Sequence, residues 1–397
     1  MPPPVLVEDS AGLEPLLAKL EAADEIAIDT EADSFFHYRE SVCLIQVTVD
    51  EEDWLIDPLA KLDLSPLGSI LADPSKTKVL HDGEYDVLIL KRDFGFTFQG
   101  IFDTRIAAAA LGVEFPGLAS VVEAHFGVEL DKSQQRSDWS RRPLSPKQIA
   151  YARYDTRFLI PLMHLQRKEL AERGRTEIHD GECRRLEALT PVQREFNPDE
   201  WVRLKGARNL DPMGRRVLRE LAIWRDGEAQ RRDLPPFKVL GNRQLLDLAA
   251  AMPGSPRDLE HLGSLPMKVI RRIGDALLEV TRKAREMEPI HTLPRLPAKD
   301  GSSVLDEFGH ELHDRLKTWR REQASAMELD SSLVVNRRTL LSIAELRPAT
   351  EADLDRVDGL IAWQKERFGS SILELVRVFE EDLAAGRIET RRRRRKR

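Results

Sequence analysis

The sequence Ile26-Ala27-Ile28-Asp29-Thr30-Glu31-Ala32-Asp33 sets the interpretation of the first half of the chain. Its apolar start is typical of a buried strand, and side chains on a strand alternate, so Asp29 and Glu31 lie on one face. Neighbouring carboxylates repel each other, and burial disfavours their charge. A divalent cation removes that cost. The alternative is a strand that enters an acidic surface loop, and the D-x-E pattern alone does not exclude it.

Length and composition predict a multidomain globular protein. The 397 residues are enough for two or three domains, and the hydrophobic fraction of 41% is ordinary. No apolar run approaches the roughly 18 residues of a membrane span. Residues 1–4 lack the pattern of a signal peptide. Because only Cys43 and Cys183 are present, we expect neither a disulfide framework nor a cysteine zinc site, and we expect a cytoplasmic protein without a membrane partner.

Charge divides the chain into an acidic front and a basic back. Residues 1–198 hold 22 Lys and Arg against 35 Asp and Glu, whereas residues 199–397 hold 39 against 33. This asymmetry suggests metal chemistry in the first half and polyanion binding in the second. Residues 391–397 alone carry seven positive charges. We therefore expect residues 387–397 to form a disordered basic tail, serving either as a binding arm or for solubility.

Hydrophobic periodicity predicts strands followed by helices in the first half. The close spacing of the first three strands suggests an antiparallel meander. The last helix has Ser145 as its N-cap, Pro146 in its first position and Gln148 to complete a capping box. Strands are expected at residues 25–32, 42–49, 53–57 and 78–81, and helices at 86–91, 102–111, 118–126 and 145–173. This order predicts an α/β domain over residues 1–190.

Three further residues join the acidic pair. Asp86 follows the fourth predicted strand, and Tyr151 and Asp155 lie four residues apart on one helix face. Alone, the last two could be a surface pair. Together, the five residues resemble the DEDD superfamily of 3′-to-5′ exonucleases, and most closely the ribonuclease D family.

The resemblance extends beyond the acids and implies an RNase H-like mixed-sheet domain. Position 150, where a second subclass carries histidine, is Ala150, so the tyrosine-bearing subclass is favoured. His81 and Gln46 fit the family pattern as structural residues that support the site. The remaining matches are Val42-Cys43-Leu44-Ile45-Gln46, Phe102-Asp103-Thr104 and Tyr151-Ala152-Arg153-Tyr154-Asp155.

The resemblance also implies a chemistry. Two divalent ions, Mg²⁺ or Mn²⁺, would assist phosphodiester hydrolysis, and such hard ions prefer carboxylate oxygens. Asp29, Glu31 and Asp155 would hold one ion, Asp29 would bridge to the second, and Asp86 would act through coordinated waters. Tyr151 would orient the attacking water, because its reference pKa of about 10 makes it a poor base.

Candidate substrate contacts follow the acidic pair. Thr30, Phe35, Phe36 and Tyr38 lie beside or after Glu31, and the aromatic residues could stack on terminal bases or anchor a loop to the core. In the second half, an arginine-rich stretch that includes Arg208 and Arg215 could contact phosphates or form a solvated helix face.

The second half repeats itself with an offset of 95 residues. Leu221-Ala222-Ile223-Trp224-Arg225 recurs as Leu316-Lys317-Thr318-Trp319-Arg320. A period this long indicates domain duplication. Each copy resembles the helical HRDC domain, copy one over residues 207–288, with helices from about 212, 242 and 266, and copy two over 303–386. Copy two replaces Pro-Pro-Phe at 235–237 with serines at 331 and 332, so its match is weaker. We expect Trp224 and Trp319 to be core residues.

The resemblance thus implies a 3′-to-5′ exoribonuclease that acts on RNA, with tRNA precursors as the implied target. Two alternatives remain at this point: a DNA-directed exonuclease of the same superfamily, and a nucleic-acid-binding scaffold with an inactive nuclease domain. If the protein is an exoribonuclease, deletion of residues 199–397 should spare the hydrolysis of short oligonucleotides and weaken tRNA processing.

Overall fold

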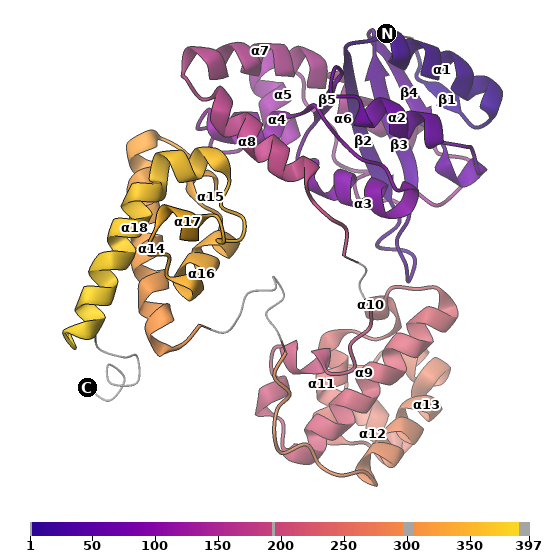
Figure 1. The fold of residues 1–397 in the computed structure, drawn as a ribbon. Helices are drawn as coiled ribbons and strands as arrows, with labels where there is room; N and C mark the ends of the chain where they lie inside the picture. Colours follow the sequence, from indigo (N-terminus) through magenta and orange to yellow (C-terminus); the bar gives the residue numbers. More distant parts are fainter. Residues whose placement is uncertain (1, 193–194, 297–304, 389–397) are drawn as a thin grey trace. The chain divides into compact units, whose positions relative to one another are not determined.

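The computed structural model describes residues 2–192, 195–296 and 305–388, which form two compact units (Figure 1). The first unit consists of the described parts of residues 1–31, 42–191 and 297–397. The second consists of the described parts of residues 32–41 and 192–296. The short segment 32–41 therefore belongs, by its contacts, to a different unit from the strands that precede and follow it.

A mixed six-stranded sheet forms the centre of the nuclease part of the first unit, in the order β1-β4-β3-β2-β5-β6. The predicted pairing of β3 with β4 is antiparallel, whereas β5 runs parallel to β2 and β6, and β1 runs parallel to β4. All residues of β3 are buried, as expected for a strand covered on both faces. The strands are β1 Val5–Val7, β2 Glu25–Ala32, β3 Val42–Val49, β4 Glu52–Ile56, β5 Thr77–Leu80 and β6 Ile101–Asp103.

The helices around this sheet correct two expectations. Residues 102 and 103, expected to be helical, end strand β6, and the helix begins at Thr104 because Asp103 caps it. The single helix expected over residues 145–173 is two helices separated at Phe158, because Pro161 has no N–H to continue the first helix. The helices are α1 Ser10–Ala22, α2 Ser65–Ala72, α3 Glu84–Phe94, α4 Thr104–Ala110, α5 Leu118–Phe126, α6 Pro146–Arg157, α7 Leu159–Glu172 and α8 Thr176–Glu187.

The second unit is the first helical copy together with segment 32–41. Its helices begin at residues 212, 242 and 267, which confirms the predicted starts to within one residue. Trp201, Leu221 and Leu277 are among its buried core residues, and Trp224 is partly buried against them. The helices are α9 Pro212–Arg232, α10 Pro236–Val239, α11 Asn242–Ala251, α12 Pro256–His261 and α13 Met267–Arg285.

The second helical copy shares a hydrophobic core with the nuclease part of the first unit. Phe102 and Met163 from the nuclease part belong to the same buried cluster as Trp319 and Phe368. Trp363 packs against α8, where a Cβ atom added to Gly181 would lie 2.3 Å from its ring. The helices are α14 Glu307–Met327, α15 Ser331–Val334, α16 Arg337–Leu346, α17 Glu351–Leu354 and α18 Ala362–Ala384.

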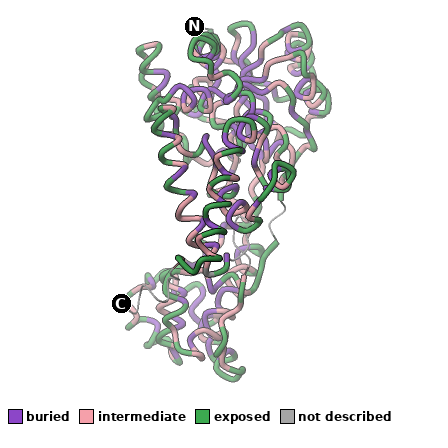
Figure 2. Tube along the Cα trace, turned by 60° about the vertical axis from the view of Figure 1, so that its left-hand side comes forward, coloured by how far each residue is buried: buried purple, intermediate pink, exposed green. Residues whose placement is uncertain are grey.

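Buried and exposed residues alternate along the longer helices, so each helix buries one face and leaves the other to solvent (Figure 2). Within the described ranges, none of these helices combines the length and apolar character needed to cross a bilayer. The expected basic tail begins at residue 387, and its residues 389–397 lie outside the described part of the chain.

Candidate active site

Strand β2 presents the two acids from the interior of the sheet, between β3 and β5. Ile26, Ala27 and Ile28 are fully buried and fix the strand in the core. Asp29 and Glu31 on one face keep part of their surface exposed, whereas Thr30 is buried on the other. The predicted alternation therefore delivers both carboxylates to one accessible face at the end of a rigid strand.

Asp86 lies in the first turn of α3 and is 6% exposed. The turn before it is fixed by Asp103, whose carboxylate accepts hydrogen bonds from the backbone N–H groups of Asp82 (3.2 Å) and Gly83 (2.8 Å). The hydroxyl of Thr30 donates a hydrogen bond to the Asp86 carboxylate. This bond ties the acid of α3 to strand β2, on which Asp29 and Glu31 lie.

Helix α6 carries Tyr151 and Asp155 and is fastened to the sheet by polar contacts. Thr156 lies 2.7 Å, oxygen to oxygen, from Thr48 of β3, and Arg153 donates to Asp53 of β4 at 2.6 Å. The Tyr151 ring packs against the buried Trp139, with the ring centroids 5.9 Å apart. Helix α6 is thus held against the sheet by polar contacts, and the Tyr151 ring is held by its contact with Trp139.

The four acids are close enough for their charges to raise one another's pKa. Loss of solvation and the charges of Asp86, Asp155 and Glu31 raise the pKa of Asp29 well above its usual value. Loss of solvation, with the same kind of repulsion, raises the pKa of Glu31 to about 9 and that of Asp155 to about 8. Loss of solvation alone is the main cause that raises the pKa of Asp86 to about 6. The charges that act most strongly on these carboxyls are those of other acids.

This donor set fits divalent metal ions. One carboxylate oxygen of Asp155, Oδ2, is buried without a hydrogen-bond partner among the described residues, which leaves an oxygen ligand without a cation or donor. Carboxylate oxygens are the ligands that Mg²⁺ and Mn²⁺ prefer. In the described ranges no three acidic, histidine or cysteine side chains converge on one point as a finished ligand set.

Without divalent ions, this cluster is expected to make stability fall as the pH rises. The pKa of Asp86, Asp155 and Glu31 is higher in the folded protein than the value of about 4 in an unfolded chain, so unfolding releases protons. Their contribution to stability is full below about pH 4 and is lost as the pH passes about 6, 8 and 9.

Added Mg²⁺ or Mn²⁺ should reverse this loss at pH 8, where the bound ions offset the repulsion. Melting temperatures measured from pH 5 to pH 9, in EDTA and with each ion, test the expectation. Identical melting curves in EDTA and in both ions at pH 8 would show that the carboxylates do not hold metal.

The other predicted site residues have structural contacts or belong to the second unit. Thr30 uses its hydroxyl on Asp86, and Phe35, Phe36 and Tyr38 belong to segment 32–41 of the second unit. Arg215 donates to the backbone carbonyls of Arg208 (2.9 Å) and His291 (3.2 Å). Their roles in substrate binding stay predictions.

Of the two residues expected to support the site, Gln46 is buried and His81 is half-buried. The hydroxyl of Thr104 donates to the carbonyl of Leu80 at 3.0 Å, so it accepts from Nδ1 of His81 at 2.8 Å. Burial lowers the pKa of His81, which keeps the ring neutral. Both amide atoms of Gln46 are buried without a partner within the described residues. Thr104, which belongs to the Phe102-Asp103-Thr104 motif, thus holds His81 in place, a role that the motif alone did not predict.

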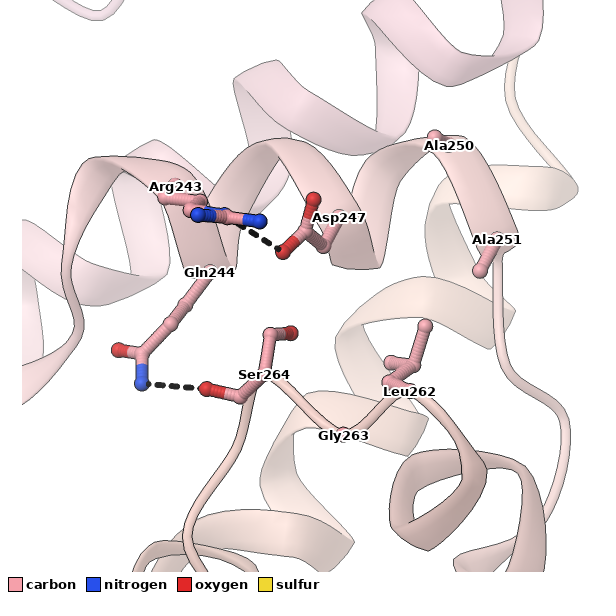
Figure 3. A pocket seen from close by; sticks show the side chains of 8 residues that line it. All are labelled: Arg243, Gln244, Asp247, Ala250, Ala251, Leu262, Gly263 and Ser264. Carbon is pink, nitrogen blue, oxygen red and sulfur yellow. Dashed lines mark hydrogen bonds and ion pairs between the residues drawn. The ribbon is translucent and has the colours of Figure 1, made fainter.

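A separate hollow lies within the first helical copy, between α11 and the loop that precedes α13 (Figure 3). Its single acid, Asp247, is 3.9 Å from Arg243, and Gln244 donates to the carbonyl of Ser264 at 3.0 Å. The repeat offset of 95 places Arg338 at the position of Arg243, and there an ion pair with Asp358 takes up the guanidinium. This hollow has no acidic cluster and is not a nuclease centre.

The fold and the acidic cluster together define a 3′-to-5′ exonuclease. A family model described as 3′-5′ exonuclease matches residues 4–171, and the HRDC domain model matches residues 214–281 and 310–376. The second match supports the duplication that the repeat predicted.

Similar proteins narrow the class. The ribonuclease D of Zymomonas mobilis is 34% identical over 94% of this chain and 93% of its own length. The ribonuclease D of Escherichia coli is 30% identical over 95% of this chain and 99% of its own length. The crystal structure of Escherichia coli RNase D, titled an exoribonuclease involved in structured RNA processing, has a TM-score of 0.67 and 29% identity over 94% of this chain and 98% of that one. The chain belongs to the ribonuclease D family and is a 3′-to-5′ exoribonuclease.

Proposed function

We propose that the protein removes nucleotides one at a time from the 3′ ends of tRNA precursors, with the help of two Mg²⁺ or Mn²⁺ ions. The observation that carries this proposal is the cluster of four mutually repelling carboxylates beside Tyr151, in a chain of this family. Exonucleases of this superfamily depend on divalent metal ions in general. The choice of ions, the roles of the residues and the tRNA target are the parts that we add to the family assignment.

The four acids divide the binding of the ions. Asp29, Glu31 and Asp155 would hold one ion, and Asp29 with Asp86 would serve the second. When bound, such ions neutralise charge on the phosphate and make a water molecule a better nucleophile. The fixed strand β2 and the fastened helix α6 supply the ligands in advance, so little reorganisation is needed when the RNA 3′ end arrives.

Tyr151 positions the reacting water. Loss of solvation, followed by repulsion from Asp155 and Glu31, raises the pKa of the Tyr151 phenol. The phenol therefore keeps its proton at neutral pH and cannot act as a base. Its hydroxyl can donate one hydrogen bond and accept another, which suits it to hold water beside the acids.

We further propose four regions with the boundaries expected from the sequence. The nuclease domain would span residues 1–190, the HRDC copies 207–288 and 303–386, and the basic tail 387–397. We place the protein in the cytoplasm, where RNA precursors are processed. Cys43 and Cys183 are both buried and neither forms a disulfide bond, which is typical of a reducing compartment.

A product assay tests this function. Purified protein should release 5′-nucleotides from a tRNA with a 3′ extension in the presence of Mg²⁺ or Mn²⁺, and should release none in EDTA. A single-stranded DNA of the same length is the control substrate. Hydrolysis of the DNA alone would replace the proposal with a DNA exonuclease, and inactivity with both ions would favour a binding scaffold.

A further inference from the structure

Segment 32–41, which follows the catalytic strand β2 in sequence, is held by the first helical copy. The hydroxyl of Tyr38 donates to Asp226 of α9 at 2.9 Å, and its backbone N–H donates to Asp233 at 3.1 Å. His37 Nδ1 lies 2.7 Å from the second oxygen of Asp233. The Tyr38 ring also packs against the core of that copy. The segment is thus fixed by polar and apolar contacts together.

Two aromatic rings beside these contacts remain about half exposed to solvent. Phe35 of the segment and Phe237 of α10 are 47% and 54% exposed. Their centroids are 6.5 Å apart and their planes meet at 72°, an edge-to-face arrangement in which each ring keeps at least one face clear of its partner. Lys238 lies next to them, with its ammonium nitrogen 3.9 Å from the centroid of Phe36. Two half-exposed phenyl rings carry a hydrophobic cost that a flat ligand would remove.

The chemistry around the rings favours an unpaired RNA base. A base offers a flat π-face to an aromatic ring, and the phosphate beside it would be attracted to Lys238. Two acids lie nearby, but Asp226 accepts a hydrogen bond from Tyr38 and Asp233 contacts His37. These contacts reduce the repulsion that the two carboxylates would exert on a polyanion. The corresponding position of the second copy is Ser332, whose hydroxyl donates to the capping residue Asp330 and which offers no ring.

Sequence distance limits how far Phe35 can lie from the acidic pair. Phe35 follows Glu31 by four residues, so the extended chain between their Cα atoms spans at most about 14 Å. That is the length of about four stacked nucleotides at 3.4 Å each. An RNA whose 3′ end lies at the acids can therefore reach the rings with a base a few nucleotides upstream.

We propose that Phe35 and Phe237 form a composite stacking site for an unpaired RNA base upstream of the 3′ end, with Lys238 beside the adjacent phosphate. RNA long enough to reach the rings then gains affinity that a dinucleotide cannot. This inference rests on the proposed function, because RNA is the ligand. Loss of one ring should weaken the binding of the longer RNA by about tenfold to a hundredfold.

The test compares Phe237→Ala with Met267→Ala in the full chain. Met267 is an apolar residue of the same helical copy that is 48% exposed, so its loss is a matched control. Phe237→Ala should lower kcat/KM on a ten-nucleotide RNA about tenfold or more and leave dinucleotide hydrolysis unchanged. Phe237→Trp should restore the longer reaction, and Met267→Ala should change neither. An equal loss on both lengths would mean that the ring pair only holds the segment, and no loss on either would exclude a binding role. Both outcomes overturn the proposal.

A second readout separates stacking from catalysis. RNA carrying 2-aminopurine at successive upstream positions is bound to the full chain with Asp155→Asn, so that it stays intact. Fluorescence quenching at one of the positions, removed by Phe237→Ala and retained with Met267→Ala, supports the stacking site. Quenching that survives Phe237→Ala overturns it. Wild-type protein that hydrolyses no RNA of any length would instead refute the proposed function. In a double-mutant cycle, Phe35→Ala and Phe237→Ala should not be additive, because they remove one site.

Discussion

Replacement of Asp155 with asparagine is expected to remove nearly all turnover and to leave RNA binding almost unchanged. The asparagine keeps the shape of the side chain but removes one negative oxygen from a cluster that has to hold cations. Loss of one preorganised electrostatic contact at a reacting centre lowers kcat by about 10²- to 10³-fold. Single-turnover cleavage of a 3′-extended tRNA measures the change in rate, and equilibrium binding of the same RNA measures affinity. A parallel loss of affinity would show that Asp155 acts in binding and is not catalytic.

The same substitution should make the metal-free protein more stable. The pKa of Asp155 is raised to about 8, so above that pH the folded protein holds a charge that its surroundings disfavour. Asparagine removes this cost, and the variant should therefore melt at a higher temperature than the wild type in EDTA at pH 8 to 9. The difference should shrink as the pH falls and should vanish below about pH 4, where the carboxyl is protonated in the folded and the unfolded chain.

Asp63→Asn is a matched control, since it makes the same chemical change at an exposed turn of the nuclease part, where Asp63 accepts from the backbone of Ser65. It should retain turnover and gain no stability in EDTA. If Asp63→Asn and Asp155→Asn behaved alike, the stability difference would not come from repulsion within the cluster.

The faces on which the candidate site residues lie could be predicted from sequence because strand and helix periodicity are local. Strand alternation alone placed Asp29 and Glu31 on one face, and helix spacing did the same for Tyr151 and Asp155. Helix α5 ends where Gly127 adopts a left-handed conformation, at φ 67°, as the glycine predicted. The break between α6 and α7 at Phe158 was not predicted. The capping box at Ser145 indicates only where a helix begins, and Pro161 was not taken as a sign of its end.

Contacts between distant parts of the sequence could not be predicted. Tyr38 and Asp226 are 188 residues apart, and no periodicity in either region indicates that they meet. The aromatic residues of segment 32–41 therefore looked equally suited to stacking on RNA and to anchoring a loop. The structure shows that Tyr38 anchors the segment and that Phe35 stays exposed beside a partner ring.

The packing of the second helical copy against the nuclease part could not be predicted from sequence either. It changes the result expected from deleting residues 199–397. Gln364 lies 3.4 Å from Glu182 of α8, and Arg175 donates to the carbonyls of Ala110 and Met327, both at 2.7 Å. Removal of residues 199–397 would expose this surface and part of a shared core. We now expect that deletion to destabilise the nuclease domain, so weaker tRNA processing in the truncated protein would not by itself show a loss of substrate clamping.

Trp363→Ala is expected to destabilise the first unit by about 3–5 kcal/mol, the range for removal of a large buried aromatic side chain. The Trp363 side chain is 4% exposed and lies between α8 and Phe368, whose ring centroid is 5.7 Å away. Calorimetry should show a lower melting transition, while the initial rate on a short RNA at low temperature stays close to that of the wild type. An unchanged melting transition would mean that the second copy is not part of the nuclease core.

A pair of glycine substitutions isolates the contact from the effect of the helix backbone. Alanine in place of glycine inside a helix stabilises it by about 0.5–1 kcal/mol when there is space for the methyl group. Gly227 in α9 has no atom within 4 Å of the added Cβ, so Gly227→Ala should raise stability. At Gly181 the same atom would meet the Trp363 ring, so Gly181→Ala should instead lower stability by about 1–3 kcal/mol. Opposite signs at two helical glycines can arise only from what each added methyl group touches, and stabilisation at both positions would show that Trp363 does not rest on α8.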